Sequence, residues 1–353
     1  MLPHSLRKQQ PNIFLTGGSG VIGQALLARL NPSSVTCLLR QTDLNVPGIS
    51  TVRGDICLPR FGLDRSQLQD LANRIDCIVH CAALTDFTRE GDIVFRTNVH
   101  SLESVLELAA LAHAPLFHIS TAFVRPCKTD TAEPSYAISK REGERLVSSS
   151  GVQHVIIRPS IVVGDSTSGA ITRFQGFHTV IGAFLNGMLP MMPASPKAYV
   201  DFIPQDVVAE TIVALINEWR IGEDYWITSG HESLTIERIG AIVKEFAQSL
   251  GKTMDLPRFF SRDTVDRLIL PVFLAELAPP IRRKFERLLQ ISSYLCIDEP
   301  FTSSMPELRS RLNLTTSPPL ELAFKRGLAY WSHATGYGKR LARLPKTPAI
   351  ASA

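Results

Sequence analysis

A glycine-rich segment near the N-terminus, Thr16–Gly23, constrains the fold of this chain more than any other feature. It follows a short apolar run typical of a strand and opens a pattern typical of a helix. In such a place Gly17 permits a tight turn, Gly20 lets the backbone come close to a pyrophosphate, and Gly23 lets the helix pack closely on the strand. Free N–H groups at the start of the helix would bind the phosphates. This context favours a dinucleotide-binding loop over an ordinary structural turn.

Strands and helices alternate through the first half of the chain. Apolar runs predict strands over Asn12–Thr16, Val35–Leu39, Thr51–Arg53, Ile75–His80, Leu116–Ser120 and His154–Arg158. Helical spacing predicts helices over Gly20–Leu30, Ile93–Ala112 and Ser135–Ser149. Such alternation is typical of right-handed β-α-β units. We therefore expect an α/β fold of the Rossmann type, with a doubly wound parallel sheet and a smaller, mainly helical C-terminal region.

The pattern changes after Pro159, where glycine and proline become frequent. We expect a loop at Gly187–Pro196. Beyond it we expect a helix over Pro204–Trp219, a strand over Asp224–Thr228 and a second helix over Ile236–Leu250. The region Phe259–Tyr337 is expected to be mainly helical, with breaks at the proline pairs 279–280 and 318–319. The expected organisation is a nucleotide-binding core at 11–165 with returning elements at 199–230, a substrate-binding region at 166–198 and 231–340, and flexible tails at 1–10 and 344–353.

The composition argues against several other classes of protein. The 353 residues contain no apolar run of the roughly 18 residues that a bilayer-spanning helix needs. Residues 1–10 lack the apolar core of a secretory signal, so we expect no transmembrane segment and a cytoplasmic location. The six cysteines form no Cys-x-x-Cys pair, so we expect no metal site. The net charge of +4 comes without a Lys/Arg run, so we expect no nucleic-acid partner.

The end of the second predicted strand indicates which dinucleotide binds. Arg40 stands where NAD-binding chains usually carry Asp or Glu to hold the ribose hydroxyls. A guanidinium would pair with the 2′-phosphate of NADP(H), whereas a carboxylate would repel it. We therefore expect NADP(H) rather than NAD(H). In the alternative interpretation, Arg40 is a solvated strand end and Asp43 is the acidic residue for the ribose.

Tyr136 and Lys140 lie four residues apart at the start of a predicted helix, so both side chains can reach one site. A nearby ammonium group would lower the tyrosine pKa, which suits proton transfer to or from a carbonyl or alcohol oxygen near neutral pH. Ser120 and Thr121 end the fifth predicted strand, at the edge where open α/β sheets bind ligands. A hydroxyl there can stabilise charge on a substrate oxygen. The other interpretation is a surface helix with a snorkelling lysine.

Together these motifs resemble the extended short-chain dehydrogenase/reductase family over about Ile13 to Thr228. Further matching segments are Gly54-Asp55-Ile56, Cys81-Ala82-Ala83, Thr97-Asn98-Val99, Ser120-Thr121, Tyr136 to Lys140 and Arg158-Pro159-Ser160. The resemblance implies that Thr121, Tyr136 and Lys140 are catalytic. It also implies that Asp55 contacts the adenine. The full set of cofactor-binding residues that we expect is Gly17, Ser19, Gly20, Val21, Ile22, Gly23, Arg40, Asp55, Ile56, Ala82, Ala83, Asn98, Tyr136, Lys140, Pro159 and Ile161.

A narrower resemblance is to the male-sterility branch, which holds fatty acyl-CoA reductases and the terminal thioester reductase domains of carboxylic acid reductases and peptide synthetases. It rests on Gly54–Leu63, His80–Phe87, Ile119–Val124, Ile157–Gly164 and Asp201–Asp206. It implies NADPH-dependent reduction of an acyl thioester, either acyl-CoA or carrier-bound, to an aldehyde, and in some members on to the alcohol. As a departure, the loop before Tyr136 is short and carries Cys127 and Lys128. No carrier domain is attached, so we expect the acyl group to arrive from another molecule, with an acyl carrier protein as a candidate partner.

In that hypothesis Thr121 and Tyr136 hold the developing oxyanion, Tyr136 supplies its proton, and Lys140 binds the nicotinamide ribose. Candidate lining residues of an acyl pocket, for which a core position is the other interpretation, are Phe174, Phe177, Phe184, Met191 and Met192. A second hypothesis is an alcohol or ketone dehydrogenase or epimerase of the same type. A third is a non-catalytic dinucleotide sensor, which the presence of the three catalytic residues disfavours. A homodimer is one candidate for the oligomeric state.

The other polar residues are expected to have structural roles. His80, His113 and His118 show no metal-ligand spacing, so core or surface positions are expected. A solvated helix face is expected for Glu142, Glu144 and Arg145. Arg158 is expected to pair with a carboxylate rather than to touch substrate.

Overall fold

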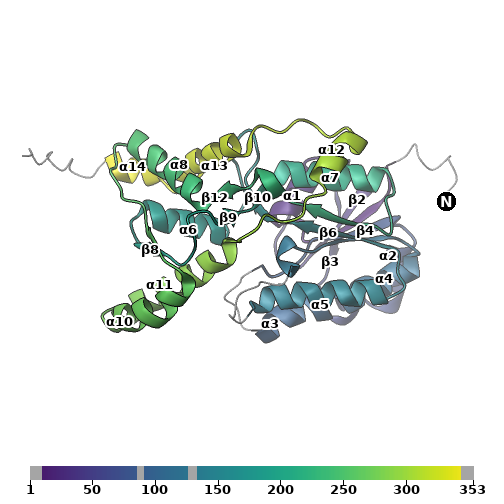
Figure 1. Cartoon of the computed structure of the whole chain (residues 1–353). Helices are drawn as coiled ribbons and strands as arrows, with labels where there is room; N and C mark the ends of the chain where they lie inside the picture. The colour runs from purple at the N-terminus through teal and green to yellow at the C-terminus, as the bar shows by residue number, and fades with distance from the viewer. Residues whose placement is uncertain (1–9, 86–90, 126–132, 343–353) are drawn as a thin grey trace, which may run out of the picture.

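A parallel sheet of seven strands forms the centre of the first half of the chain. The structure is a computed structural model, and it describes residues 10–85, 91–125 and 133–342 (Figure 1). The strands are β1 Ile13–Thr16, β2 Val35–Leu39, β3 Ser50–Arg53, β4 Cys77–His80, β5 Leu116–Ile119, β6 His154–Pro159 and β11 Asp224–Ile227. Each predicted strand is therefore present, with ends that differ from the prediction by at most two residues, and the expected Rossmann-type sheet is confirmed.

The strand order is β11-β6-β5-β4-β1-β2-β3. The chain builds outward from β1 to β3, then crosses to β4 on the other side of β1 and builds outward again to β11. This reversal between β1 and β4 is a topological switch point, and open α/β sheets bind ligands in the crevice beyond the carboxyl ends of the strands at such a point. The glycine-rich segment follows β1 directly, so the topology places it at this crevice.

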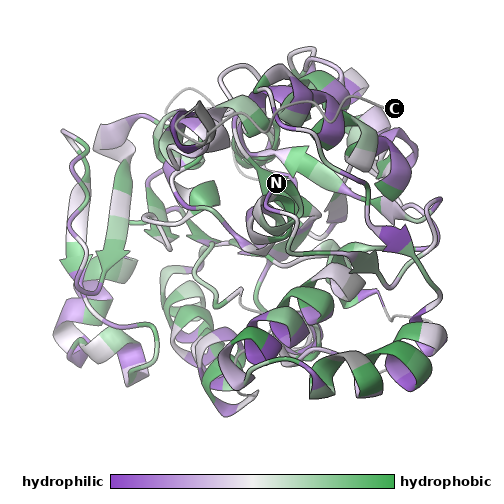
Figure 2. Cartoon of the chain, turned by 90° about the vertical axis from the view of Figure 1, so that its left-hand side faces the viewer, coloured by the Kyte–Doolittle hydropathy of each residue, from purple (hydrophilic) through white to green (hydrophobic). Residues whose placement is uncertain are grey.

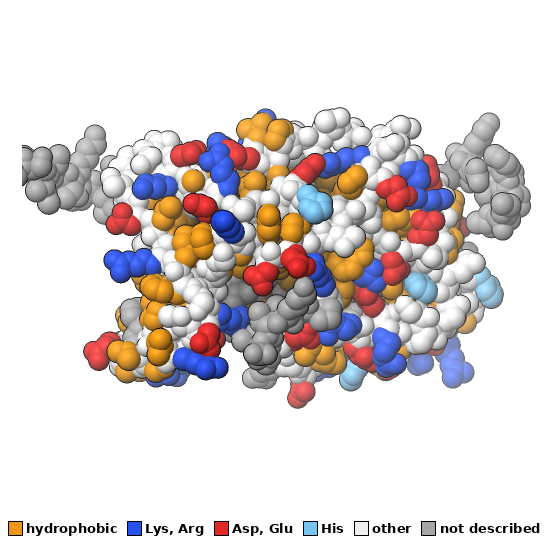
Figure 3. Space-filling view, viewed as in Figure 1, with side chains coloured by type: hydrophobic (Ala, Val, Ile, Leu, Met, Phe, Trp, Pro, Cys, Tyr) orange, Lys and Arg blue, Asp and Glu red, His pale blue; other side chains and the backbone are white. Residues whose placement is uncertain are grey.

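Helices cover both faces of the sheet (Figure 1). One face is packed by α1 Val21–Leu27 and α7 Gln205–Asn217, and the other by α2 Arg65–Ala72, α4 Leu102–Ala112 and α5 Ser135–Ser149. The inner strands are buried, whereas the edge strand β3 is mostly exposed. Figure 2 shows helices with hydrophobic and hydrophilic residues on different sides, as expected for helices that each bury one face. Among the described residues, no helix is long and apolar enough to cross a membrane. Acidic and basic side chains are interspersed on the face shown in Figure 3.

A second hydrophobic cluster lies in the C-terminal half. Its helices are α6 Gly176–Leu185, α8 Ile236–Ser249, α11 Pro279–Leu295, α13 Leu320–Ala334 and α14 Tyr337–Ala342. Three short strand pairs join it to the rest of the chain: β7 Ile161–Val163 with β10 Phe202–Pro204, β9 Tyr199–Val200 with β12 Leu234–Thr235, and β8 Met191–Met192 with β13 Arg258–Phe259. The small helices α9 Arg262–Thr264 and α10 Leu270–Ala275 lie with α11, which projects away from the sheet (Figure 1). In contrast, α12 Met305–Leu312 packs against α7 with the sheet.

Several local predictions were wrong. The single helix predicted over Ile93–Ala112 is interrupted, because α3 Gly91–Phe95 and α4 are joined by a π-helical turn, η4 Arg96–His100. Helices α2 and α6 were not predicted. In contrast, the breaks predicted at the two proline pairs are present, and a new helix begins at each: Pro279 opens α11, and Pro319 caps α13. Proline is favoured at such positions because the first N–H groups of a helix have no partner within it.

Candidate active site

The glycine-rich loop has the close backbone contacts that were predicted from its sequence. Gly17 has a φ of +73°, and a Cβ on it would lie 2.6 Å from the backbone nitrogen of Ala82. A Cβ on Gly23 would lie 2.2 Å from the carbonyl oxygen of Gly17. The Gly20 N–H donates to that same carbonyl at 2.9 Å, and Gly20 caps α1 without a side chain. The loop therefore leaves no room for a Cβ on Gly17 or Gly23, which fits the close approach of its backbone to a dinucleotide pyrophosphate.

The residues expected to determine whether NADP(H) or NAD(H) binds follow the strands β2 and β3. Arg40 follows β2, its side chain is 65% exposed, and its Nη1 lies 3.7 Å from Oδ2 of Asp55 after β3. The other carboxylate oxygen of Asp55 accepts a hydrogen bond from the Cys57 N–H at 2.9 Å. Asp43, the alternative acidic residue, pairs with Arg53. Both ion pairs lie at the surface, since the side chains of Arg40 and Asp43 are 65% and 82% exposed, and the Arg40 guanidinium is accessible to an anion.

Asn98 joins the end of β4 to the start of α5. Its side-chain amide accepts from the Leu84 N–H at 2.8 Å and donates to the Leu84 carbonyl and to Oγ of Ser139, each at 3.0 Å. The Ser139 hydroxyl donates in turn to the Tyr136 carbonyl at 2.8 Å. Asn98 lies on the π-helical turn, and such turns are frequent at functional sites. The sequence prediction of one regular helix missed this turn, although it selected Asn98 itself.

Thr121, Tyr136 and Lys140 come together beyond the end of β5, and all three are buried. Burial raises the pKa of Tyr136 to about 12, against a lowering effect of a hydrogen bond with Thr121. Burial lowers the pKa of Lys140 to about 8, and its Nζ donates to the Ile119 carbonyl at 2.7 Å. The expectation that Lys140 lowers the tyrosine pKa was therefore wrong for the protein alone: desolvation dominates, and the phenol is neutral at pH 7.

A buried ionic network lies behind Ser120. Arg158 forms two hydrogen bonds to the Glu144 carboxylate, at 2.9 and 2.7 Å, and a third to Asp224 at 2.9 Å. The Ser120 hydroxyl donates to Glu144, and the Arg158 guanidinium lies over the Trp226 ring. The prediction that Arg158 pairs with a carboxylate is confirmed. The prediction of a solvated face was wrong for Glu144, whose side chain is only 12% exposed.

His80 and His118 are core residues, as expected. Their rings stack at 5.6 Å between centroids, and Nδ1 of His80 lies 2.8 Å from Oγ1 of Thr16. Burial lowers the pKa of His80 to about 3, and burial also lowers the pKa of His118. Within the described residues, neither ring nitrogen of His118 has a hydrogen-bond partner, and no group of three or more His, Cys, Asp or Glu side chains is placed to hold a metal ion.

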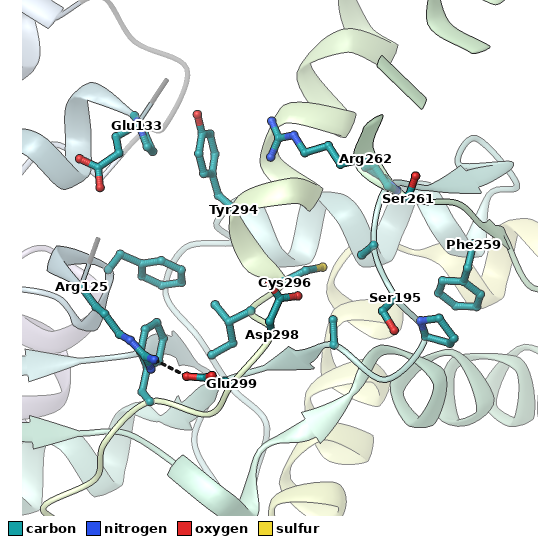
Figure 4. Close-up of a pocket in the computed structure, with 18 of the residues that line it drawn as sticks. Arg125, Glu133, Ser195, Phe259, Ser261, Arg262, Tyr294, Cys296, Asp298 and Glu299 are labelled. Atoms are coloured by element: carbon teal, nitrogen blue, oxygen red, sulfur yellow. Dashed lines mark hydrogen bonds and ion pairs between the residues drawn. The ribbon is translucent and has the colours of Figure 1, made fainter. Parts of the chain in front are cut away.

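A cavity of about 530 Å³ opens near the end of β5 and the start of α5 (Figure 4). Its lining includes Phe123, two residues after Thr121, and Ala137, directly after Tyr136. Most of the remaining lining comes from three segments far apart in the sequence, residues 193–198, 259–262 and 294–301. All three segments lie within the substrate-binding region expected at 166–198 and 231–340, but none of their residues was named as a candidate lining residue.

The acyl-pocket residues predicted from the sequence lie elsewhere. Phe177, Phe184, Met191 and Met192 are buried in the C-terminal hydrophobic cluster, and Phe174 is 36% exposed beside His178 and Tyr330. Their alternative interpretation as core residues is confirmed for the first four. The other expected cofactor residues stand at strand ends or in the glycine loop: Ser19, Val21, Ile22, Ile56, Ala82, Ala83, Pro159 and Ile161. Cys127, Lys128, Asp86 and Phe87 lie outside the described residues.

Comparisons with known proteins agree with this geometry. Residues 43–212 match the family model described as male sterility protein. The PKS-NRPS hybrid synthetase acdB of Aspergillus candidus is 34% identical over 175 residues, which cover 46% of this chain but only 7% of that synthetase. This chain thus corresponds to a small part of such a relative.

Solved structures share the fold along almost the whole chain. The terminal R domain from the myxalamid PKS-NRPS biosynthetic pathway has a TM-score of 0.74 at 23% identity, covering 93% of this chain and 92% of that one. A thiolation-reductase di-domain from an archaeal non-ribosomal peptide synthetase has a TM-score of 0.69 at 17% identity, covering 94% and 76%. With the glycine loop, the matched segment and this fold in place, the chain carries a male-sterility-type domain, an NAD(P)-binding reductase domain of the extended short-chain dehydrogenase/reductase family.

Proposed function

We propose that the protein reduces an acyl thioester, carried on the phosphopantetheine arm of a carrier protein, to an aldehyde with NADPH. The observation that carries this proposal is the hydrogen bond between Thr121 and Tyr136, whose chain neighbours Phe123 and Ala137 line the large cavity. Five aromatic side chains line that cavity, Phe123, Phe259, Phe260, Tyr294 and Phe301, which suits an apolar acyl group. The carrier is proposed because the similar proteins named above are a synthetase, a terminal R domain and a thiolation-linked reductase.

The residues of the chain have distinct tasks in this reaction. The bound cofactor supplies a hydride to the thioester carbonyl carbon. Thr121 and Tyr136 donate hydrogen bonds to the carbonyl oxygen as its negative charge develops. Because burial keeps the phenol protonated at neutral pH, Tyr136 can give its proton to that oxygen. Lys140 stabilises the phenolate that remains and binds the nicotinamide ribose. The hemithioacetal then breaks its C–S bond, which releases the aldehyde and the free thiol.

We infer NADPH rather than NADH from Arg40. Its guanidinium is exposed at the end of β2 and close to Asp55, the residue expected at the adenine. A 2′-phosphate carries a charge that a guanidinium can hold through two parallel hydrogen bonds. The neighbouring carboxylate of Asp55 would orient the guanidinium without neutralising it fully, because the two groups are 3.7 Å apart and partly exposed.

Oxidation of NADPH measured with acyl-pantetheine, acyl-CoA and acyl carrier protein thioesters, and with aldehydes and ketones, tests the proposal. We expect turnover of thioesters, with carrier-bound ones giving the highest kcat/KM. The Tyr136→Phe variant should lose about 100-fold or more in kcat, the usual loss on removing a general acid. Tyr330→Phe, on α13 and away from the cavity, is the matched control and should retain the wild-type rate.

The ratio of NADPH oxidised to thiol released identifies the product. A ratio of one indicates an aldehyde, and a ratio of two indicates reduction on to the alcohol. If ketones turn over while no thioester does, the protein is instead an alcohol or ketone dehydrogenase. If Tyr136→Phe keeps full activity, the assignment of the catalytic residues is wrong.

A further inference from the structure

One stretch of the cavity wall, residues 296–301, lies far along the chain from the catalytic residues but contacts the turn that carries Thr121. We call it the wall segment. It follows α11, and it supplies Cys296, Ile297, Asp298, Glu299 and Phe301 to the lining of the cavity (Figure 4).

Both ends of the wall segment are held by the rest of the protein. At its start, Ile297 exchanges two backbone hydrogen bonds with Tyr199, at 2.7 and 2.9 Å. Just beyond its end, the Thr302 carbonyl accepts from the Thr228 hydroxyl at 2.7 Å, and the Ser304 N–H donates to the Trp226 carbonyl at 2.8 Å on the edge strand β11. The segment is therefore fixed independently of the turn that it contacts.

The contacted turn is η5, Ala122–Val124, which follows β5 and is capped by Thr121. The Thr121 hydroxyl accepts a hydrogen bond from the Phe123 N–H at 3.3 Å. The Phe123 ring meets the Phe301 ring edge-on, with centroids 5.4 Å apart. Arg125, directly after the turn, donates to the Pro300 carbonyl at 3.1 Å and to the Glu299 carboxylate at 2.8 Å (Figure 4). The wall segment thus contacts the turn through the Phe123 ring and holds Arg125 directly after it.

A turn of three residues has little stability of its own, so its neighbours determine where it lies. On its other side, the Arg141 guanidinium of α5 donates to the Val124 carbonyl at 3.0 Å. Small displacements matter here, because a shift of about 1 Å in a catalytic group can lower a rate by about 100-fold. An anchored wall on one side and α5 on the other would fix the turn within that tolerance.

We infer that Phe301 and Arg125 are positioning residues, which hold η5 so that the Thr121 hydroxyl stays against Tyr136. The inference rests on the proposed function, and it adds that the wall segment determines the position of Thr121, the residue proposed to bind the oxyanion. Since Phe123, Arg125 and Phe301 also line the cavity, an acyl group that fills it presses on the residues that orient Thr121. A poorly fitting acyl group should then lower kcat and not only raise KM.

The test compares Phe301→Ala and Arg125→Ala with Phe259→Ala. Phe259 lines the same cavity but lies on β13, across the cavity from Arg125 (Figure 4), so it is the matched control for loss of a lining aromatic. Each change is made in the wild type and in the Thr121→Val background. We expect Phe301→Ala and Arg125→Ala to lower kcat by about 10-fold in the wild type and by less than about twofold in the Thr121→Val background, since coupled residues are not additive. Phe259→Ala should mainly raise KM, equally in both backgrounds.

A second measurement does not depend on turnover. In protein labelled with ¹³C at the tyrosine ring carbon that bears the hydroxyl, the Tyr136 resonance is identified by its loss in Tyr136→Phe. We expect Phe301→Ala and Arg125→Ala to move this resonance toward its position in Thr121→Val, and Phe259→Ala to leave it in place. Arg125 is partly exposed, so its variant keeps the test valid if Phe301→Ala does not fold.

The outcomes separate the two proposals. If the wild-type protein reduces no thioester, the proposed function fails, while the resonance still decides the positioning roles. If both variants leave the Tyr136 resonance unchanged, or if their kcat losses multiply with that of Thr121→Val, then Phe301 and Arg125 are ordinary lining residues and the inference is overturned.

Discussion

Three glycines in the loop after β1 should respond very differently to the same change, replacement by alanine. A Cβ on Gly23 would lie 2.2 Å from the Gly17 oxygen and 2.7 Å from the Gly18 Cα, both backbone atoms of the loop itself. A Cβ on Gly18 would meet only the tips of three side chains, Leu44 at 3.1 Å, Cys37 at 3.2 Å and Leu15 at 3.7 Å. Gly17 combines a φ of +73° with a backbone contact of 2.6 Å.

The contact distances set the expected order of the losses. Gly23→Ala forces the loop backbone to move by about 1 Å, and overpacking of this kind costs about 1–3 kcal/mol in the free energy of unfolding. Gly17→Ala causes a similar clash and in addition costs roughly 1–2 kcal/mol in the free energy of unfolding, because alanine must adopt a left-handed backbone conformation. For Gly18→Ala the side chains can move, and the lower entropy of the unfolded chain offsets part of the strain by about 0.4–1 kcal/mol. Its net change should stay below about 1 kcal/mol.

Urea unfolding and NADPH titration measure the two consequences. Gly23→Ala and Gly17→Ala should lower the urea midpoint clearly and raise the Kd for NADPH by about tenfold or more, since 1.4 kcal/mol of lost contact corresponds to a factor of ten. Gly18→Ala should lie near the wild type in stability. If Gly18→Ala is as damaging as Gly23→Ala, or if Gly23→Ala binds NADPH normally, then the close backbone contacts do not determine the shape of the loop.

Three further predictions concern residues around the loop and behind the site. Arg40→Ser should raise the Kd for NADPH by about 10- to 100-fold, because a charge-assisted hydrogen bond contributes about 1.5–3 kcal/mol; the Kd for NADH should hardly change, and an equal loss for both would refute the role. His118→Phe should make the free energy of unfolding fall less steeply below pH 6.5. Burial lowers the pKa of His118, so acid protonates this histidine in the unfolded chain first and thereby destabilises the wild type. If the urea midpoint falls as much between pH 7 and pH 4.5 in the variant as in the wild type, this reasoning is wrong. Glu144→Gln should cost about 3 kcal/mol in the free energy of unfolding, because it leaves Arg158 without its main partner. Glu142→Gln, in an exposed pair with Arg145, should leave the urea midpoint close to that of the wild type, and similar losses for the two variants would be inconsistent with a buried network.

Local features of the site were predictable because each depends on a short stretch of chain. The loop at Thr16–Gly23 could be recognised since its glycines, strand and helix are contiguous. The contact between Thr121 and Tyr136 followed from a resemblance that places one at a strand end and the other at a helix start. The raised pKa of Tyr136 could not be predicted in this way, because desolvation depends on everything packed around the phenol.

The cavity shows where reasoning from the sequence failed. Aromatic and methionine side chains at 174–192 were expected to line it, but four of the five belong to the C-terminal hydrophobic cluster. The wall is built instead from residues 193–198, 259–262 and 294–301, which lie in loops apart from Phe259 on β13, Arg262 on α9 and Tyr294 on α11. Loops carry no periodic pattern, and which loops meet depends on how α11 and the short strand pairs are packed, so residue type alone could not distinguish lining from core.

The sequence by itself therefore determined the parallel sheet and the glycine-rich dinucleotide loop, and it named the candidate catalytic side chains. The first two follow from hydrophobic periodicity and from glycine geometry within single elements. Only the tertiary structure decided that Glu144 is buried with Arg158, that burial raises the pKa of Tyr136, and that Phe301 reaches the turn after Thr121. Those outcomes depend on contacts between residues up to 178 positions apart, such as Phe123 with Phe301, and the packing that brings them together is not encoded in any local pattern.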